Sequence, residues 1–153
     1  MAQWSLHNTY FGDLLEKGWD FFGKALQTDP DAFLAGTIDP IRFTEVARNE
    51  INIETVEYVN TFYFGKANNM EYQTELKKVA KNEDVSSRLI MCDAEGNLGD
   101  PDETARHQTI ENHKKWVDAA EFLGCESIRV NARIEGEYNE QMKLAADGLR
   151  SLC

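Results

Sequence analysis

The sequence is short of cysteine, of basic residues and of long apolar runs, and each shortage argues against a class of protein. Its three cysteines, Cys92, Cys125 and Cys153, are odd in number and widely spaced without a CxxC pair, so we expect reduced thiols rather than a disulfide framework. No apolar run approaches the roughly 20 residues that a membrane helix needs. The N-terminus lacks a basic stretch followed by an apolar one, so we expect a cytoplasmic chain, with export of a longer precursor left open.

Acidic residues, in contrast, are abundant. The 153 residues include 27 Asp and Glu against 16 Lys and Arg, which gives a formal net charge of −11. Such a chain repels phosphate backbones and anionic lipid headgroups, so neither a nucleic acid nor a membrane is expected as a partner. Hydrophobic residues make up 42% of the sequence, which is enough for one domain over residues 1–153 with a buried core.

Strand-like and helix-like segments alternate along this domain. Short runs rich in β-branched or large apolar residues predict four strands, at residues 3–7, 54–60, 88–93 and 127–132. Periodicity and start signals predict helices at residues 39–49, 70–81, 100–123 and 139–152. The last helix is expected to carry an apolar stripe on one face, formed by Met142, Ala145, Ala146, Leu149 and Leu152. This order predicts an α/β fold built from parallel βα units with right-handed crossovers.

One segment, at about residues 8–38, is too long for a simple βα loop of about 2 to 6 residues. Apolar residues recur in it at helical spacing, namely Phe11, Leu14, Leu15, Trp19, Phe22 and Leu26. We therefore predict an inserted amphipathic helix with a short turn after Pro30. A packing helix over a strand end, or a subunit contact, is slightly favoured over a lid on a substrate pocket.

Several motifs with known chemistry are incomplete. Residues 18–25 nearly spell a phosphate-binding P-loop, but Ala25 replaces the Ser or Thr that binds magnesium. No GxGxxG follows the first predicted strand, so a dinucleotide site is not expected. His107 and Glu111 have the i,i+4 spacing of a metal-binding pair, but this spacing is more common on solvated surfaces. His113 lies within an apolar stripe, between Ile110 and Val117, and is predicted to be a core histidine.

The ends of the predicted strands carry polar residues. Side chains alternate along a strand, so Arg129 and Asn131 share the face that points into a barrel or toward its mouth. A buried arginine needs a partner, and Glu57 in the second strand is the predicted one, in a substrate site or as a purely structural ion pair. His7 and Asp93 end the first and third strands, so four parallel strands each bring a polar residue toward their carboxyl ends.

A family resemblance covers these residues. The stretches AQWSLH (2–7), VEYVN (56–60), LIMCDAEGNLGDPDE (89–103) and ENHKKWVDAAEFLGCESIRVNA (111–132) resemble the sugar phosphate isomerase/epimerase family of the xylose-isomerase-like TIM barrel superfamily. The family barrel has eight strands, and this chain resembles its first four βα units. The resemblance therefore implies a half-barrel, a partial TIM-barrel domain over residues 1–153 with the insertion after its first strand.

The resemblance also implies a reaction. A divalent metal (Mn²⁺, Mg²⁺, Co²⁺ or Zn²⁺) in such barrels polarises an open-chain sugar while acids and bases move a proton through an enediol. Its carboxylate and histidine ligands lie on later strands, so we assign no metal ligand and no catalytic residue here and expect the chain to be inactive alone. His7, Glu57, Arg129 and Asn131 match family positions that line the pocket and are expected to bind hydroxyl groups of a sugar or sugar phosphate.

Two alternatives remain at the sequence level. A non-enzymatic half-barrel that pairs with itself or with a partner chain is one, because a four-stranded half leaves its edge strands without neighbours. Self-association is therefore expected. The superfamily also includes zinc AP endonucleases, which the charge of −11 and the lack of basic clusters disfavour.

Overall fold

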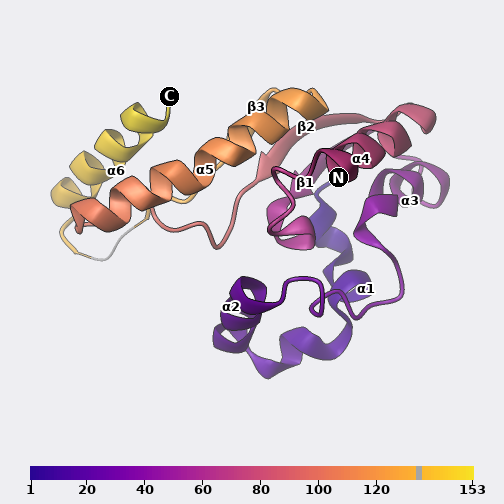
Figure 1. The fold of residues 1–153 in the computed structure, drawn as a ribbon, viewed down its shortest axis with the longest axis horizontal. Coiled ribbons are helices and arrows are strands. Elements are labelled where there is room, and N and C mark those ends of the chain that lie inside the picture. The colour runs from indigo at the N-terminus through magenta and orange to yellow at the C-terminus, as the bar shows by residue number, and fades with distance from the viewer. Residues whose placement is uncertain (134–135) are drawn as a thin grey trace.

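A small parallel sheet backed by helices forms the centre of the fold (Figure 1). The structure is a computed structural model that describes residues 1–133 and 136–153. Strands β1 (Thr55–Val59), β2 (Ser86–Met91) and β3 (Ser127–Arg129) lie in the order β1-β2-β3, and both pairings are parallel. The predicted α/β class with a parallel sheet is confirmed at this level.

The described part of the chain contains six α-helices: α1 (His7–Phe11), α2 (Trp19–Thr28), α3 (Phe43–Asn49), α4 (Met70–Asn82), α5 (Glu103–Leu123) and α6 (Tyr138–Leu152). Four 3-10 helices accompany them: η1 (Gln3–Leu6), η2 (Gly12–Lys17), η3 (Pro40–Arg42) and η4 (Asn60–Tyr63). None of these described helices has the length and apolar character needed to cross a membrane.

Local hydrogen bonds and a glycine set the starts and the end of the predicted helices at residues 39–49 and 100–123. The Asp39 carboxylate accepts a hydrogen bond from the amide of Ile41, and Pro40 opens η3. Asp102 caps α5 by accepting from the amide of Ala105 at 2.8 Å. Gly124 ends the same helix with a φ of 83°, a left-handed conformation that favours glycine.

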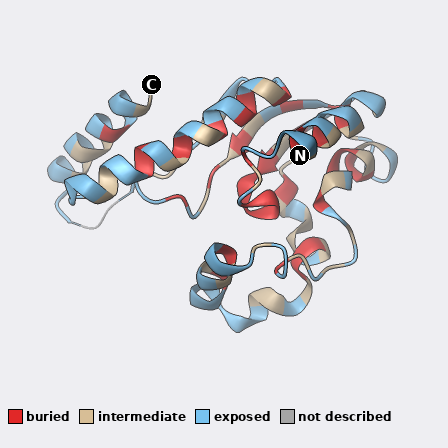
Figure 2. Ribbon diagram, viewed as in Figure 1, coloured by how far each residue is buried: buried red, intermediate tan, exposed pale blue. Residues whose placement is uncertain are grey.

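The hydrophobic core lies between one face of the sheet and helices α3 to α5, and it continues into the N-terminal segment, where Phe11 and Leu26 are fully buried. Tyr58 and Ile90 are paired across β1 and β2, and both are fully buried. Tyr63 packs edge-on against Tyr58 and against Trp116 of α5. Figure 2 shows this burial as red segments along the inward side of α5.

The opposite face of the sheet is more open. Glu57, Leu89 and Ser127 lie side by side across the three strands, and Ser127 is exposed while the other two are half-buried. A sheet with one face covered by helices and one face open is consistent with partial α/β units.

The predicted strand at residues 3–7 is wrong. The main-chain contact with the edge of β1 occurs earlier, where Ala2 bridges to Glu57 and the amide of Glu57 donates to the carbonyl of Met1 at 2.9 Å. Farther along the β1 edge, the side chain of Gln3 replaces a main-chain partner, because its Oε1 accepts a hydrogen bond from the amide of Val59 at 3.1 Å. The backbone is therefore free to turn into η1 and α1.

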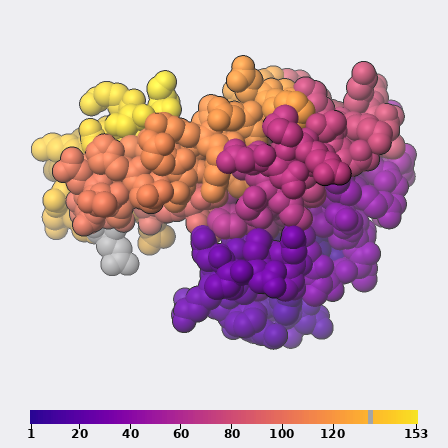
Figure 3. All heavy atoms as spheres, in the orientation of Figure 1, coloured from indigo at the N-terminus to yellow at the C-terminus, as the bar shows by residue number. Residues whose placement is uncertain are grey.

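The segment at residues 8–38 folds as several short helices rather than one long helix. Gly12 and Gly18 have φ values of 58° and 91°, and each stands where one helical piece ends and the next begins. Residues 18–25, the incomplete P-loop, lie mostly within α2. Figure 3 shows this N-terminal segment as a lobe in indigo and purple that projects from the rest of the molecule.

The fourth predicted strand is shorter than expected, whereas the last predicted helix has the expected bounds as α6 but packs differently. β3 has three residues, because beyond it the carbonyl of Asn131 accepts from the loop residue Leu98. Helix α6 packs through Gly148, where a Cβ atom would lie 1.9 Å from the carbonyl oxygen of Leu98. Met142 and Leu149, which belong to the predicted apolar stripe, are exposed.

Candidate functional site

A cavity of about 460 Å³ lies at the carboxyl ends of the three strands. Its walls come from the N-terminal segment, α2 and the residues at or after the strand ends, namely Trp4, Trp19, Phe22, Thr61, Met91, Asp93, Ala94 and Arg129. Ligands of parallel α/β sheets bind at this end of the strands. A second cavity, of about 340 Å³, lies near Ser86 and Arg88 at the amino end of β2, which is the unfavoured end.

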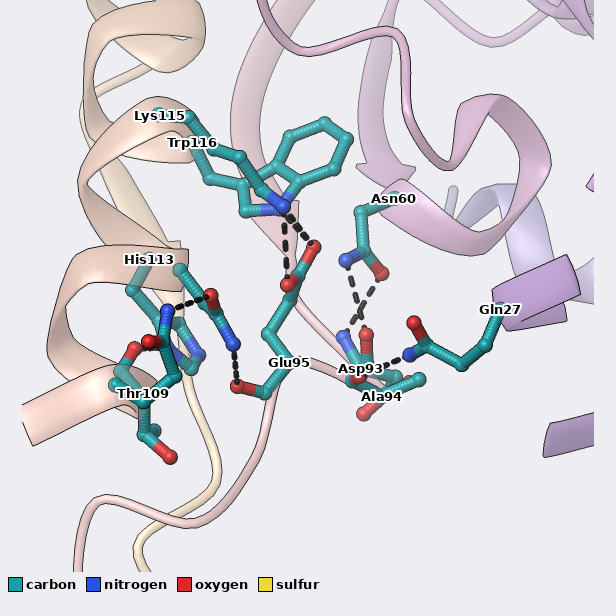
Figure 4. Close-up of polar contacts among 11 residues, drawn as sticks. Gln27, Asn60, Asp93, Ala94, Glu95, Thr109, His113, Lys115 and Trp116 are labelled. Atoms are coloured by element: carbon teal, nitrogen blue, oxygen red, sulfur yellow. Dashed lines mark hydrogen bonds and ion pairs between the residues drawn. The ribbon is translucent and has the colours of Figure 1, made fainter. Parts of the chain in front are cut away.

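Asp93 is the polar centre of this cavity. Its Oδ1 accepts hydrogen bonds from Arg129 Nη1 at 3.0 Å and from Asn131 Nδ2 at 2.9 Å. Its main chain is held by the buried Asn60, which accepts from the Asp93 amide at 2.8 Å and donates to the Asp93 carbonyl at 2.9 Å (Figure 4). The ends of all three strands are therefore joined through one aspartate.

Two of the four predicted site residues, Arg129 and Asn131, meet here, but the predicted partner of Arg129 is wrong. Arg129 pairs with Asp93 and not with Glu57. The register explains the difference. Met91 lies opposite Arg129, so Asp93 is two residues farther along the neighbouring strand, whereas Glu57 lies level with Leu89 on the strand beyond.

His7 and Glu57 do not line the cavity. His7 stacks on Trp4 with ring centroids 5.2 Å apart, and its Nδ1 lies 2.8 Å from the Trp4 carbonyl oxygen. His7 therefore packs against Trp4, which lines the cavity, without lining the cavity itself. Glu57 lies on the open face of the sheet, before the carboxyl end of β1.

An aromatic wall faces the polar centre. Trp4 and Trp19 are stacked with centroids 6.1 Å apart, and Phe22 meets Trp4 edge-on. Trp19 is 68% exposed although it packs in this cluster. A large exposed indole beside polar groups is typical of a ligand contact. The helical spacing slightly favoured a packing role for the segment that contains Trp19 over a lid on a pocket, and the exposure of the Trp19 indole in the fold identifies it as part of the cavity wall.

The loop after β2 is fixed by a buried carboxylate that the sequence analysis did not single out. Glu95 is 4% exposed. It accepts from the indole Nε1 of Trp116 at 2.6 Å and from Lys115 Nζ at 3.0 Å (Figure 4). From the other side, Gln27 of α2 donates to the carbonyl of Ala94 at 3.0 Å. Asp93 therefore stands on a loop that is tied to both α5 and α2.

The core histidine was predicted correctly. His113 is fully buried, and its Nδ1 donates to the carbonyl oxygen of Thr109 at 2.7 Å. The adjoining loop passes so close to α5 that a Cβ atom on Gly96 would lie 2.2 Å from the Thr109 hydroxyl oxygen. Gly96 has a φ of 101°, so both its conformation and its surroundings require glycine.

The nearby cysteine is not an activated nucleophile. Burial raises the pKa of the Cys92 thiol to about 12, and the carboxylates of Glu95 and Asp93 add to the shift. A thiol that stays protonated at neutral pH attacks poorly. Cys92 therefore has a packing role beside the cavity.

The described part of the chain does not by itself offer a ligand set for the divalent metal that the family resemblance implies. No group of three or more His, Cys, Asp or Glu side chains in the described ranges is arranged to hold a metal ion. Asp93 is engaged by Arg129 and Asn131, and a cation beside it would have to compete with the guanidinium. His107 pairs at 3.8 Å with Glu103 instead of Glu111.

Comparison of the sequence with protein-family models and with curated proteins gives no match. The chemistry of the cavity is therefore interpreted from its own residues. An apolar aromatic wall opposite an aspartate, an arginine and a threonine can hold a small molecule that has both C–H surface and hydroxyl groups.

Proposed function

We propose that this chain forms the substrate-binding wall of a sugar (phosphate) isomerase or epimerase of the xylose-isomerase-like TIM barrel type, as the first half of such a barrel. The parallel β1-β2-β3 order and the helices that cover one face of the sheet support this placement. The position of the cavity, at the carboxyl ends of the strands, is where such barrels bind substrate.

The two-sided cavity is the observation that carries this proposal. Trp4, Trp19 and Phe22 present ring faces and edges on one side, while Asp93 and Arg129 present charged hydrogen-bonding groups on the other. A sugar has the same division, with C–H groups on its faces and hydroxyl groups at its rim. Apolar burial then supplies affinity, and the few polar groups fix orientation.

The polar residues have separate roles in this proposal. Arg129 donates to substrate oxygens, and Asp93 accepts from a substrate hydroxyl. Asn131 and Asn60 are not assigned to substrate. Their amide groups donate hydrogen bonds to Asp93 and hold it in place. No residue of the cavity is assigned to proton transfer or to metal binding, since the described residues form no group of three or more possible ligands.

Titration with free and phosphorylated sugars, followed by tryptophan fluorescence, tests the proposal. Trp4 and Trp19 lie in the cavity, so bound sugar is expected to change their emission. Arg129→Ala is expected to weaken the response. Arg88→Ala is the matched control, because Arg88 pairs with Glu126 near the amino end of the same sheet. An absence of any response to every sugar would contradict the proposal.

A second candidate is the self-associating half-barrel without enzyme activity. The specific observation in its favour is the outer edge of β3, with which no strand pairs among the described residues. An unpaired edge is a template for association. This candidate is distinguished from the first by an oligomer that forms without any response to sugars.

A further inference from the structure

The cavity at the carboxyl ends of the strands has a balanced charge. Asp93 and Arg129 are the two charged side chains among its lining residues, and they are paired with each other at 3.0 Å. The same carboxylate oxygen, Asp93 Oδ1, also accepts a hydrogen bond from the side-chain amide of Asn131. The cavity therefore has no net charge to offer an ionic ligand.

A phosphorylated ligand needs more positive charge than this cavity supplies. A phosphate monoester carries a charge of about −1.5 to −2 near neutral pH and is usually bound by several cationic or amide donors. Arg129 can donate its other N–H groups to a phosphate while it stays paired with Asp93, but the neighbouring carboxylate repels the same phosphate. On the loop after β2 and on α5, two lysines are engaged by carboxylates, since Lys115 pairs with Glu95 and Lys114 with Glu111.

The helix end at the cavity does not change this balance. Helix α2 begins at Trp19, and the amino end of a helix attracts anions. However, Asp20 stands in its first turn and is exposed, so a carboxylate already complements that dipole. The whole chain, with its net charge of −11, adds a long-range repulsion to any anion.

An uncharged diol fits the same pair without separating it. Each hydroxyl group can both donate and accept a hydrogen bond. Neighbouring hydroxyls can therefore donate to Asp93 and accept from Arg129 while the ion pair stays closed. The exposed ring of Trp19 supplies a surface for the C–H groups of the same molecule.

From these observations we infer that the Asp93–Arg129 pair selects an unphosphorylated, polyhydroxylated ligand, a free sugar or polyol, and rejects its phosphate ester. This inference rests on the proposed sugar site and decides between the two substrate classes that the family resemblance leaves open. Asp93 is the specificity-determining residue, because it neutralises the guanidinium that would otherwise bind phosphate.

The test compares free and phosphorylated probes on the whole chain. D-fructose, D-xylose, D-fructose 6-phosphate and inorganic phosphate are titrated separately and followed by tryptophan fluorescence and by the NMR signal of the arginine side chains. In the unchanged protein we expect at least one free sugar to bind and D-fructose 6-phosphate and phosphate to bind at least about tenfold more weakly.

Asp93→Asn is the decisive variant, because it frees Arg129 while keeping a side chain of the same shape. We expect this variant to reverse the preference, with a gain of about tenfold or more for D-fructose 6-phosphate and a new arginine shift with inorganic phosphate. Glu126→Gln is the matched control. It also removes one carboxylate that pairs with an arginine, but at the other end of the sheet, and it is expected to keep the original preference.

The outcomes separate this inference from the proposed function. Tighter binding of D-fructose 6-phosphate than of either free sugar by the unchanged protein, lost in Arg129→Ala, would overturn the inference and leave the sugar site standing. An Asp93→Asn protein that keeps the original preference would also overturn it. If none of the four probes changed the tryptophan fluorescence or the arginine NMR signal, the sugar site itself would be refuted.

Discussion

At the residue scale, Arg129 shows how exposure decides what an ion pair contributes. Its side chain is 50% exposed and that of Asp93 is 33% exposed, so water screens their attraction. We expect Arg129→Ala to lower the free energy of unfolding by only about 0.2–1 kcal/mol, while it weakens the proposed sugar binding. Urea unfolding and fluorescence titration measure the two effects. A loss of about 3 kcal/mol or more would mean that the pair is buried in solution.

The cysteines give a prediction about pH. Burial raises the pKa of Cys92 to about 12 and that of Cys125 to about 11, from an ordinary value of 9.0. Above about pH 9 the unfolded chain loses these protons while the folded chain keeps them. The free energy of unfolding should therefore be fully retained below pH 9 and should fall as the pH rises toward 12.

Denaturant unfolding at a series of pH values checks this. The midpoint should fall steadily above about pH 9, and Cys92→Ala should reduce the slope of that fall. Burial also raises the pKa of Tyr58 and Tyr63, so some slope remains in the variant. A midpoint that stays constant up to about pH 11 would show that these groups are accessible to water.

The residues of the candidate site could be predicted from the sequence only in part. Alternation along a strand was enough to place Arg129 and Asn131 on one face, and the structure joins both to Asp93. The choice of Glu57 as partner was wrong because it needs the strand register, which depends on how β2 lies between β1 and β3. Glu95 could not be predicted, since its burial comes from tertiary contacts with α5.

At the element scale, the loop of residues 93–98 depends on the Glu95 anchor. Trp116→Phe keeps an aromatic ring against Tyr63 but removes the indole donor to the buried carboxylate. We expect a loss of about 1–3 kcal/mol of stability together with weaker sugar binding, because Asp93 is two residues from Glu95. Thermal unfolding and the fluorescence titration measure both.

The neighbouring Lys114 provides the control for that variant. Lys114 pairs with Glu111 on the exposed side of the same helix, so Lys114→Ala is expected to leave both stability and binding nearly unchanged. If Trp116→Phe lost stability but bound sugar normally, the anchor would be structural and would not position Asp93.

The helices were predicted more accurately than the strands, for a physical reason. Helix starts such as Asp39 and Asp102 are set by local hydrogen bonds within a few residues. Strand existence depends on a distant partner. At the N-terminus, Gln3 satisfies the β1 edge with its side chain, and the backbone folds into a 3-10 helix. Local apolar content alone could not predict this.

At the scale of the whole molecule, the two edge strands of the sheet differ in whether other parts of the chain pair with their outer edges. The edge of β1 is covered, since the amino group of Met1 donates to the Thr55 carbonyl at 2.7 Å and Ala2 bridges to Glu57. The edge of β3 has no such cover in the described part of the chain. Beside it lies an apolar groove of about 240 Å³ that includes Val117 and Ile128. Val117, which belongs to the apolar stripe around His113, lines this groove and is 42% exposed.

This asymmetry leads to the last prediction, that the isolated 153-residue chain forms a dimer through β3. One open edge per molecule can pair with the same edge of a second copy, and the covered β1 edge then stops further growth. Ser127→Lys places a charge at the open edge and is expected to shift the chain toward monomer without unfolding it. Ser151→Lys, an equally exposed change on α6, should leave the dimer intact. Sedimentation equilibrium with thermal unfolding measures both. A monodisperse, cooperatively unfolding monomer of the unchanged chain would disprove the prediction and show that the β3 edge is stable in water.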